Sequence, residues 1–175
     1  MGGIGRNLRK KAAAFDMKIV YHNRRRLSEE MAGGAKYVGF EELLRGSDVI
    51  SLNLPLNVSI MRFTPSPHIA PRQPNLHQKE TRHKISTAEF ALMKPGVVIV
   101  NTARGAVIDE AALVEALDSG HVASVGLDVY EDEPAVHPGL LANPHVILMP
   151  HMGTWTVEVS YRFFPLNAMV VKCPL

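Results

Sequence analysis

Residues 97–128 read VVIVNTARGAVIDEAALVEALDSGHVASVGLD and contain the clearest structural pattern in the chain. The apolar runs at 97–100 and 122–128 predict two buried strands. Between them, 110–118 predicts a helix, with Asp109 as its N-cap and Gly120 as its terminator. Continuously apolar strands joined by a helix are typical of a parallel sheet covered by helices. This stretch therefore predicts a β–α–β unit of an α/β domain.

The same alternation continues on both sides of that stretch. Further strands are predicted at 17–23, 48–54 and 146–149, and further helices at 5–15, 41–45 and 86–94. The last of these helices begins at Ser86, with Glu89 three residues later, which is a capping box. We therefore predict a doubly wound, Rossmann-like parallel sheet that binds its ligands at the carboxyl ends of the strands.

Composition narrows the class of protein. The chain has 175 residues, 46% hydrophobic and 21% charged, which is ordinary for a globular domain and excludes disordered and fibrous classes. The chain has 19 basic and 17 acidic residues, so its charge balance does not favour a nucleic-acid partner. Cys173 is the single cysteine, so an internal disulfide is excluded, and no apolar run has the length of a membrane span. With no signal-peptide pattern at the start, we expect a cytoplasmic protein with no membrane partner.

The glycines at the start of the chain resemble part of a dinucleotide-binding turn. The start reads x-G-x-x-G: the middle glycine of the fingerprint, Gly2, lets the backbone approach a pyrophosphate, and the last, Gly5, allows close packing of helix and strand. Gly3 and Ile4 between them are also predicted to bind the cofactor. The amino end of the helix favours phosphate groups. The first glycine of the fingerprint and the strand before it are not in the sequence. Taken alone, such a start is also typical of a flexible terminus.

Asn23 and Arg24 follow the predicted strand 17–23, where an NAD-binding domain carries an acidic residue. Asparagine removes charge repulsion, and the adjacent arginines supply bidentate partners for a 2′-phosphate. The cofactor is therefore NADP or NAD, and Asn23-Arg24 favours NADP. A charged surface loop is the alternative interpretation.

Three later motifs carry a family resemblance. They are NTARG at 101–105, GLDVYEDEP at 126–134 and PHMGT at 150–154. Taken singly, each is compatible with an ordinary turn or a structural histidine. Together, in this order and at this spacing, they closely resemble the D-isomer-specific 2-hydroxyacid dehydrogenases, the glyoxylate/hydroxypyruvate reductases included.

This resemblance implies a set of roles. His151 would be the acid/base that protonates the substrate carbonyl, Glu133 would orient it, and Arg104 would bind the 2-keto acid and border the cofactor. Asp128 would accept the nicotinamide carboxamide. Four further positions would line the cofactor cleft: Leu54, Pro55, Thr102 and Ala103. The reaction implied is hydride transfer between NAD(P)H and a small 2-keto or 2-hydroxy acid, in a homodimer and without a metal.

Five other histidines match no catalytic motif, and we interpret them as structural or solvent-facing: His22, His83, His121, His137 and His145.

The sequence also departs from the family pattern. Residues 1–158 form a dinucleotide-binding domain without its first strand, and no substrate-binding domain is expected, so a strand edge and apolar surface should be exposed. The stretch 58–78 is an irregular insertion with four prolines and no acidic residue, and 159–175 is an aberrant tail. Both begin with Val-Ser, which suggests translated introns. Spliced transcripts would then join the codons of Asn57 and Lys79. A genuine loop and a natural tail are the alternative.

Two functions from different classes follow. The first is an NAD(P)H-dependent reductase whose activity we expect to be far below that of an intact relative. The second is a non-catalytic dinucleotide-binding or interaction module left by truncation.

Overall fold

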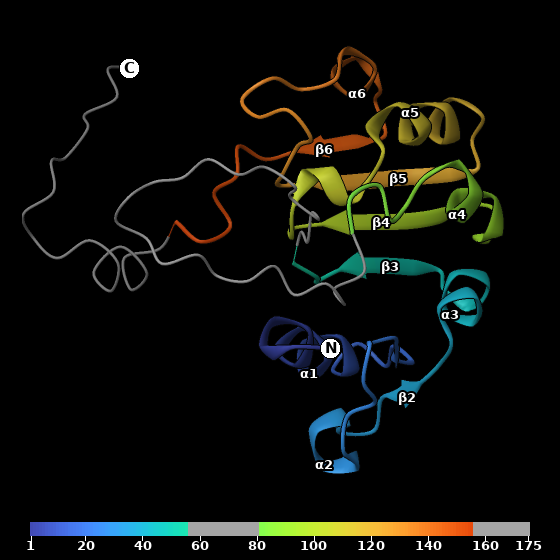
Figure 1. The fold of residues 1–175 in the computed structure, drawn as a ribbon, viewed down its shortest axis with the longest axis vertical. Coiled ribbons are helices and arrows are strands. Elements are labelled where there is room, and N and C mark those ends of the chain that lie inside the picture. Colours follow the sequence, from blue (N-terminus) through green and yellow to red (C-terminus); the bar gives the residue numbers. More distant parts are fainter. Residues whose placement is uncertain (56–80, 156–175) are drawn as a thin grey trace, which may run out of the picture.

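The computed structural model describes residues 1–55 and 81–155, which form two parallel sheets (Figure 1). A two-stranded sheet pairs β1 (Val20–Tyr21) with β2 (Lys36–Tyr37). A four-stranded sheet has the order β3-β4-β5-β6. Its strands are β3 (Val49–Leu52), β4 (Val97–Asn101), β5 (Val122–Leu127) and β6 (Val146–Leu148).

Helices alternate with these strands along the chain. They are α1 (Gly3–Ala13), α2 (Glu29–Ala32), α3 (Phe40–Gly46), α4 (Thr87–Leu92), α5 (Glu110–Asp118) and α6 (Pro138–Ala142), with a 3₁₀ turn η1 (Gly105–Val107). The four predicted helices correspond to α1, α3, α4 and α5, and the five predicted strands to β1, β3, β4, β5 and β6. The predicted parallel α/β, Rossmann-like fold is confirmed.

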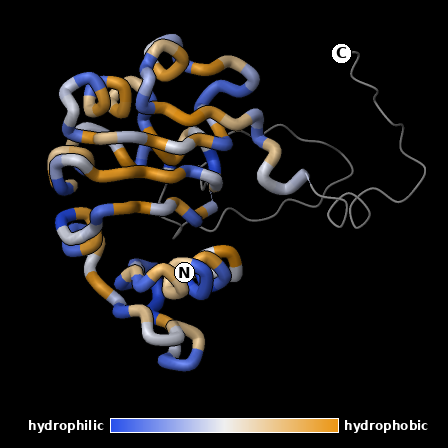
Figure 2. The backbone as a smooth tube through the Cα atoms, turned by 180° about the vertical axis from the view of Figure 1, so that it is seen from behind, coloured by the Kyte–Doolittle hydropathy of each residue, from blue (hydrophilic) through white to orange (hydrophobic). Residues whose placement is uncertain are grey.

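The core lies on the four-stranded sheet and under α5. Ile99 of β4 and Leu113 of α5 are completely buried, and Val125 of β5 lies beside them in the same core. The tube of β4 and β5 is largely apolar in Figure 2. Burying continuous β-branched runs between layers is what makes a parallel sheet stable.

Asp109 joins the starts of two helices. Its Oδ1 accepts the Ala112 amide at 3.2 Å as the N-cap of α5, and its Oδ2 accepts the Ser86 hydroxyl at 2.9 Å. Ser86 in turn begins α4, where its amide donates to Glu89 Oε2 at 3.2 Å. Burial raises the pKa of Asp109, but the bonds from Ala112 and Ser86 outweigh it and hold that pKa below its ordinary value.

Replacing Asp109 by alanine is therefore expected to lower the free energy of unfolding by about 1–2 kcal/mol. Because the pKa of Asp109 is lower in the folded than in the unfolded chain, its carboxylate stabilises the fold at neutral pH. This contribution is lost as the pH falls through that pKa. Urea unfolding at pH 7 and at pH 3 measures both effects. Asp118→Ala, at the other end of α5, is the control; an equal loss there would contradict the capping argument.

The two ends of the undescribed stretch between residues 55 and 81 lie side by side. The Thr81 hydroxyl donates to the Pro55 carbonyl at 2.9 Å. An insertion between them requires this proximity. The insertion at 58–78 and the tail at 159–175 themselves lie outside the described residues and stay predictions.

One predicted sheet is observed as two. The break falls between β1 and β3, which belong to different sheets. Val20 and Val49, on the two sides of the break, are 38% and 44% exposed. Across the break, Lys84 Nζ lies 4.3 Å from the Phe40 ring centroid, and Phe40 packs on His22. Among the described helices, none is long and apolar enough to cross a membrane.

Candidate functional site

The carboxyl ends of β4, β5 and β6 bring three motif segments to one edge of the sheet. Asn101, Leu127 and Leu148 are register partners at this edge, so the residues that follow them emerge together. In open α/β sheets this edge is where ligands bind. The predicted catalytic residues all belong to it.

His151 and Glu133 form a hydrogen-bonded pair. His151 Nδ1 lies 2.8 Å from Glu133 Oε2, while the Tyr130 amide donates to Glu133 Oε1 at 3.0 Å. Because a carboxylate only accepts, Nδ1 carries the proton, and Nε2 is the nitrogen that can face a substrate. His151 adopts a left-handed conformation with φ +52°, which costs a non-glycine residue about 1–2 kcal/mol. Its surroundings must supply that energy.

The charge of Glu133 is stabilised by the same contacts. Burial raises the pKa of Glu133. The hydrogen bonds from His151 and the Tyr130 amide, together with the charges of His151 and Arg104, lower it by a larger amount, so the pKa lies below its ordinary value. Glu133 is therefore ionised at neutral pH. An ionised carboxylate at Nδ1 accepts the ring proton there and holds the orientation of the imidazole.

Arg104 is exposed at the same edge. Its Nη1 donates to the Ala103 carbonyl at 2.6 Å, and its charge acts on Glu133. The residue behind it, Gly105, is buried against the Tyr130–Glu131 peptide, where a Cβ would overlap the Tyr130 carbonyl. The backbone of the Arg104 segment thus rests directly on the segment that carries Glu133.

Asn101 is a site residue that the sequence analysis did not assign. It is 1% exposed, its Oδ1 accepts the Ala103 amide at 3.0 Å, and its Nδ2 donates to the Arg104 carbonyl at 3.0 Å. These bonds set the turn of residues 102–104. The available signal was a polar residue directly after an apolar strand.

Asp128 is buried and holds the segment that contains His151. Its Oδ1 accepts the Met152 amide and its Oδ2 the Gly153 amide, both at 2.9 Å. Its predicted bond to the nicotinamide carboxamide stays a prediction.

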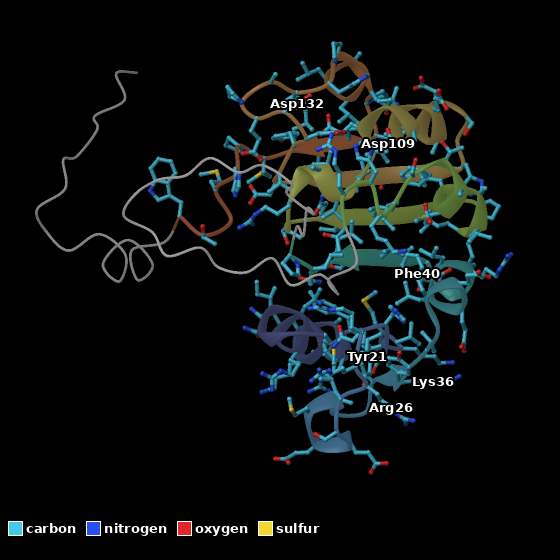
Figure 3. All side chains as sticks on the ribbon, in the orientation of Figure 1. Tyr21, Arg26, Lys36, Phe40, Asp109 and Asp132 are labelled. Atoms are coloured by element: carbon cyan, nitrogen blue, oxygen red, sulfur yellow. The ribbon has the colours of Figure 1, made fainter. Side chains whose placement is uncertain are left out.

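The remaining cofactor candidates belong to other elements. Gly2 is the N-cap of α1, Gly3 is its first residue, and Asn23 and Arg24 follow β1, where the Asn23 carbonyl accepts the Tyr37 hydroxyl at 3.1 Å. These belong to the two-stranded part, as do the labelled Tyr21, Arg26 and Lys36 in Figure 3, whereas Asp109 and Asp132 lie on the four-stranded part. Leu54 and Pro55 follow the carboxyl end of β3.

The start of α1 fits an anionic dinucleotide. Gly2 makes no side-chain cap, the first turn has no acidic residue, and nothing lies within 4 Å of the Cβ positions of Gly2 and Gly3. The first amides of a helix have no carbonyl partner within it and attract phosphate. Gly5 differs from its expected role, since a Cβ there would contact the Met1 side chain rather than a strand.

Four of the other histidines have structural hydrogen bonds. The ring nitrogens of His22 and His121 bond the carbonyls of Val38 and Phe90, at 3.0 and 2.8 Å. His83 pairs with Glu131, and His137 caps α6. Within residues 1–55 and 81–155, no group of three or more His, Cys, Asp or Glu could hold a metal ion.

The family described as D-isomer specific 2-hydroxyacid dehydrogenase, NAD binding domain, matches residues 1–70 and 73–153. The chain belongs to this family. As a D-isomer-specific 2-hydroxyacid dehydrogenase domain, it is an NAD(P)-binding domain, which confirms the resemblance drawn from the three motifs.

Curated relatives agree with the assignment. The domain is 57% identical over 160 residues to 4-methyl-2-oxopentanoate reductase A of Aspergillus oryzae, covering 91% of this chain and 42% of that protein. It is 43% identical over 163 residues to glyoxylate reductase 1 of Saccharomyces cerevisiae, covering 93% of this chain and 41% of that protein. The chain thus spans less than half the length of these relatives.

Solved structures show the same fold. A glyoxylate reductase from Paecilomyes thermophila superposes with a TM-score of 0.79 at 56% identity, covering 93% of this chain and 43% of that one. An NADPH-dependent glyoxylate/hydroxypyruvate reductase from Sinorhizobium meliloti, solved with NADP and malonate, superposes with a TM-score of 0.73 at 29% identity. The match covers 90% of this chain and 42% of that one.

Proposed function

We propose that this domain takes part in the NAD(P)H-dependent reduction of a small 2-keto acid. The observation that carries the proposal is the meeting of Arg104, Glu133 and His151 at one sheet edge, with His151 Nδ1 2.8 Å from the Glu133 carboxylate. A purely structural dinucleotide module would not need an exposed arginine beside a carboxylate–imidazole pair.

The residues divide the work of the reaction. Bound NAD(P)H supplies the hydride that reaches the substrate carbonyl carbon. The Arg104 guanidinium binds the substrate carboxylate with two parallel hydrogen bonds, a task that its planar fork allows. His151 gives a proton from Nε2 to the carbonyl oxygen, and Glu133 keeps the proton on Nδ1 and holds the ring orientation.

The substrate class we propose is a small 2-keto acid such as glyoxylate or hydroxypyruvate. Relatives are named for glyoxylate and for 4-methyl-2-oxopentanoate, so the 2-keto acid group is the part of the substrate that they share. Arg104 and His151 would recognise this 2-keto acid group, which explains why different substrates of the family share it.

For the cofactor we propose NADPH in preference to NADH. Asn23 places no negative charge at the end of β1, and Arg24 next to it is exposed and able to bind a 2′-phosphate. The contact should give the phosphate a charge-assisted hydrogen bond.

Isothermal titration calorimetry of the chain with NADPH and NADH tests the cofactor preference. We expect NADPH to bind about tenfold more tightly, since a hydrogen bond to a charged group contributes about 1.5–3 kcal/mol. Arg24→Ala should remove this difference, while Arg45→Ala on α3 should leave it unchanged. Equal binding of both cofactors by the unsubstituted chain would contradict the preference, and binding of neither would contradict the proposed function.

A homodimer and a cytoplasmic location are also proposed. The family resemblance supports the first, and the single cysteine, as expected for a reducing compartment, supports the second.

A further inference from the structure

The segment that carries His151 is held at three points by two side chains from the end of β5. The Tyr130 hydroxyl donates to the Met149 carbonyl at 2.6 Å, two residues before His151. Asp128 accepts the amides of Met152 and Gly153, one and two residues after it. The three bonds enclose the one left-handed histidine at the site.

The two holding side chains are buried, whereas the histidine is accessible. Tyr130 and Asp128 are each 8% exposed, whereas the side chain of His151 is 45% exposed. At Gly153 a Cβ would lie 2.7 Å from Asp128 Oδ2, so a larger residue there would push against the carboxylate. An exposed imidazole in a strained conformation keeps its orientation only if its backbone is fixed from below.

We infer that Tyr130 and Asp128 are positioning residues that hold His151 in its left-handed conformation and so direct the imidazole at Glu133. Tyr130 holds both members of the pair, because its amide also bonds Glu133 Oε1 at 3.0 Å. For Asp128 this is a role in addition to the predicted carboxamide contact. What His151 does for a substrate rests on the proposed function; its placement does not.

The test is a carbon-detected NMR titration of the Glu133 carboxyl in the 175-residue chain. The hydrogen bond and charge of His151 lower the pKa of Glu133, so any loss of the pair must raise it. Tyr130→Phe keeps the ring and the amide and removes the hydroxyl. Asp128→Asn keeps one acceptor oxygen and puts an NH₂ against an amide donor. Both should move the Glu133 midpoint upward, towards its value in His151→Gln.

A matched control removes a buried hydroxyl elsewhere. Ser47 Oγ donates to the Leu43 carbonyl at 2.7 Å before β3, and Ser47→Ala should leave the Glu133 titration unchanged. Asp109 serves as an internal reference, because its lowered pKa depends on α4 and α5 and should not move in either variant. A merely destabilised fold would shift Asp109 as well as Glu133.

The inference is overturned if both variants titrate Glu133 as the unsubstituted chain does while His151→Gln raises its pKa. If the Asp128→Asn variant does not fold, the Glu133 titration of the Tyr130→Phe variant decides the question alone. The unsubstituted chain gives a second test, because the amides of Met152 and Gly153 should exchange hydrogen more slowly than the exposed amides beside them. Equal exchange would also overturn the inference. Failure of NADPH binding leaves these readouts intact and affects only the proposed function.

Discussion

Replacing His151 by glutamine is expected to lower the rate of NADPH-dependent glyoxylate reduction by roughly 10²–10⁴-fold, the usual contribution of a positioned acid or base. Glutamine is close to histidine in size, but an amide does not release a proton near neutral pH. The rate of NADPH oxidation, followed by its absorbance at a high concentration of the chain, gives the ratio of the rates with and without the substitution. Since we expect the chain to be far less active than an intact relative, the comparison is with the unsubstituted chain.

The matched control is His121→Gln. His121 Nε2 bonds the Phe90 carbonyl at 2.8 Å, at the opposite end of the sheet from the site, and its replacement should leave the rate unchanged. NADPH affinity should be the same in all three proteins, because His151 acts on the keto acid. An unchanged rate in His151→Gln would exclude His151 as the acid.

Replacing Gly105 by alanine is expected to destabilise the fold by about 3 kcal/mol or more, at the upper end of what overpacking costs. A Cβ at this position would overlap the backbone carbonyl of Tyr130. That peptide cannot move aside, because Glu110 Oε1 accepts the Glu131 amide at 2.7 Å from a buried position. Urea unfolding, followed by circular dichroism, measures the change in unfolding free energy.

Gly46→Ala is the control for this substitution. Gly46 ends α3, nothing lies within 4 Å of its Cβ position, and its conformation is not left-handed. Alanine there should leave the stability unchanged or raise it by up to about 1 kcal/mol. Equal stabilities of the Gly105 and Gly46 variants would contradict the close approach between the Arg104 and Glu133 segments.

The sequence was sufficient for the parts of the fold whose signals are local. The runs at 97–100 and 122–128 form β4 and β5, because a mostly apolar run rich in β-branched residues is most stable as a strand buried on both faces of a parallel sheet. Asp109 caps α5 as its position predicts. The site motifs were recognised for the same reason, since each is a short contiguous stretch.

Elements that depend on tertiary contacts were not predicted. β2 has two residues and α2 four, too few for periodicity to show, and β2 exists because it pairs with β1. The roles of Asn101 and Tyr130 arise from bonds across turns and between strand ends, which no local pattern reveals. The need for glycine at position 105 likewise depends on a peptide 25 residues further along the chain.

We propose that the carboxyl edge of the sheets and the start of α1 form one dinucleotide site. Amide NMR spectra of the chain during addition of NADPH test it most directly. We expect shifts at Gly2–Gly5, Asn23, residues 102–104 and Asp128, saturating together with one affinity. Shifts confined to other surfaces, or no shifts at millimolar NADPH, would contradict it.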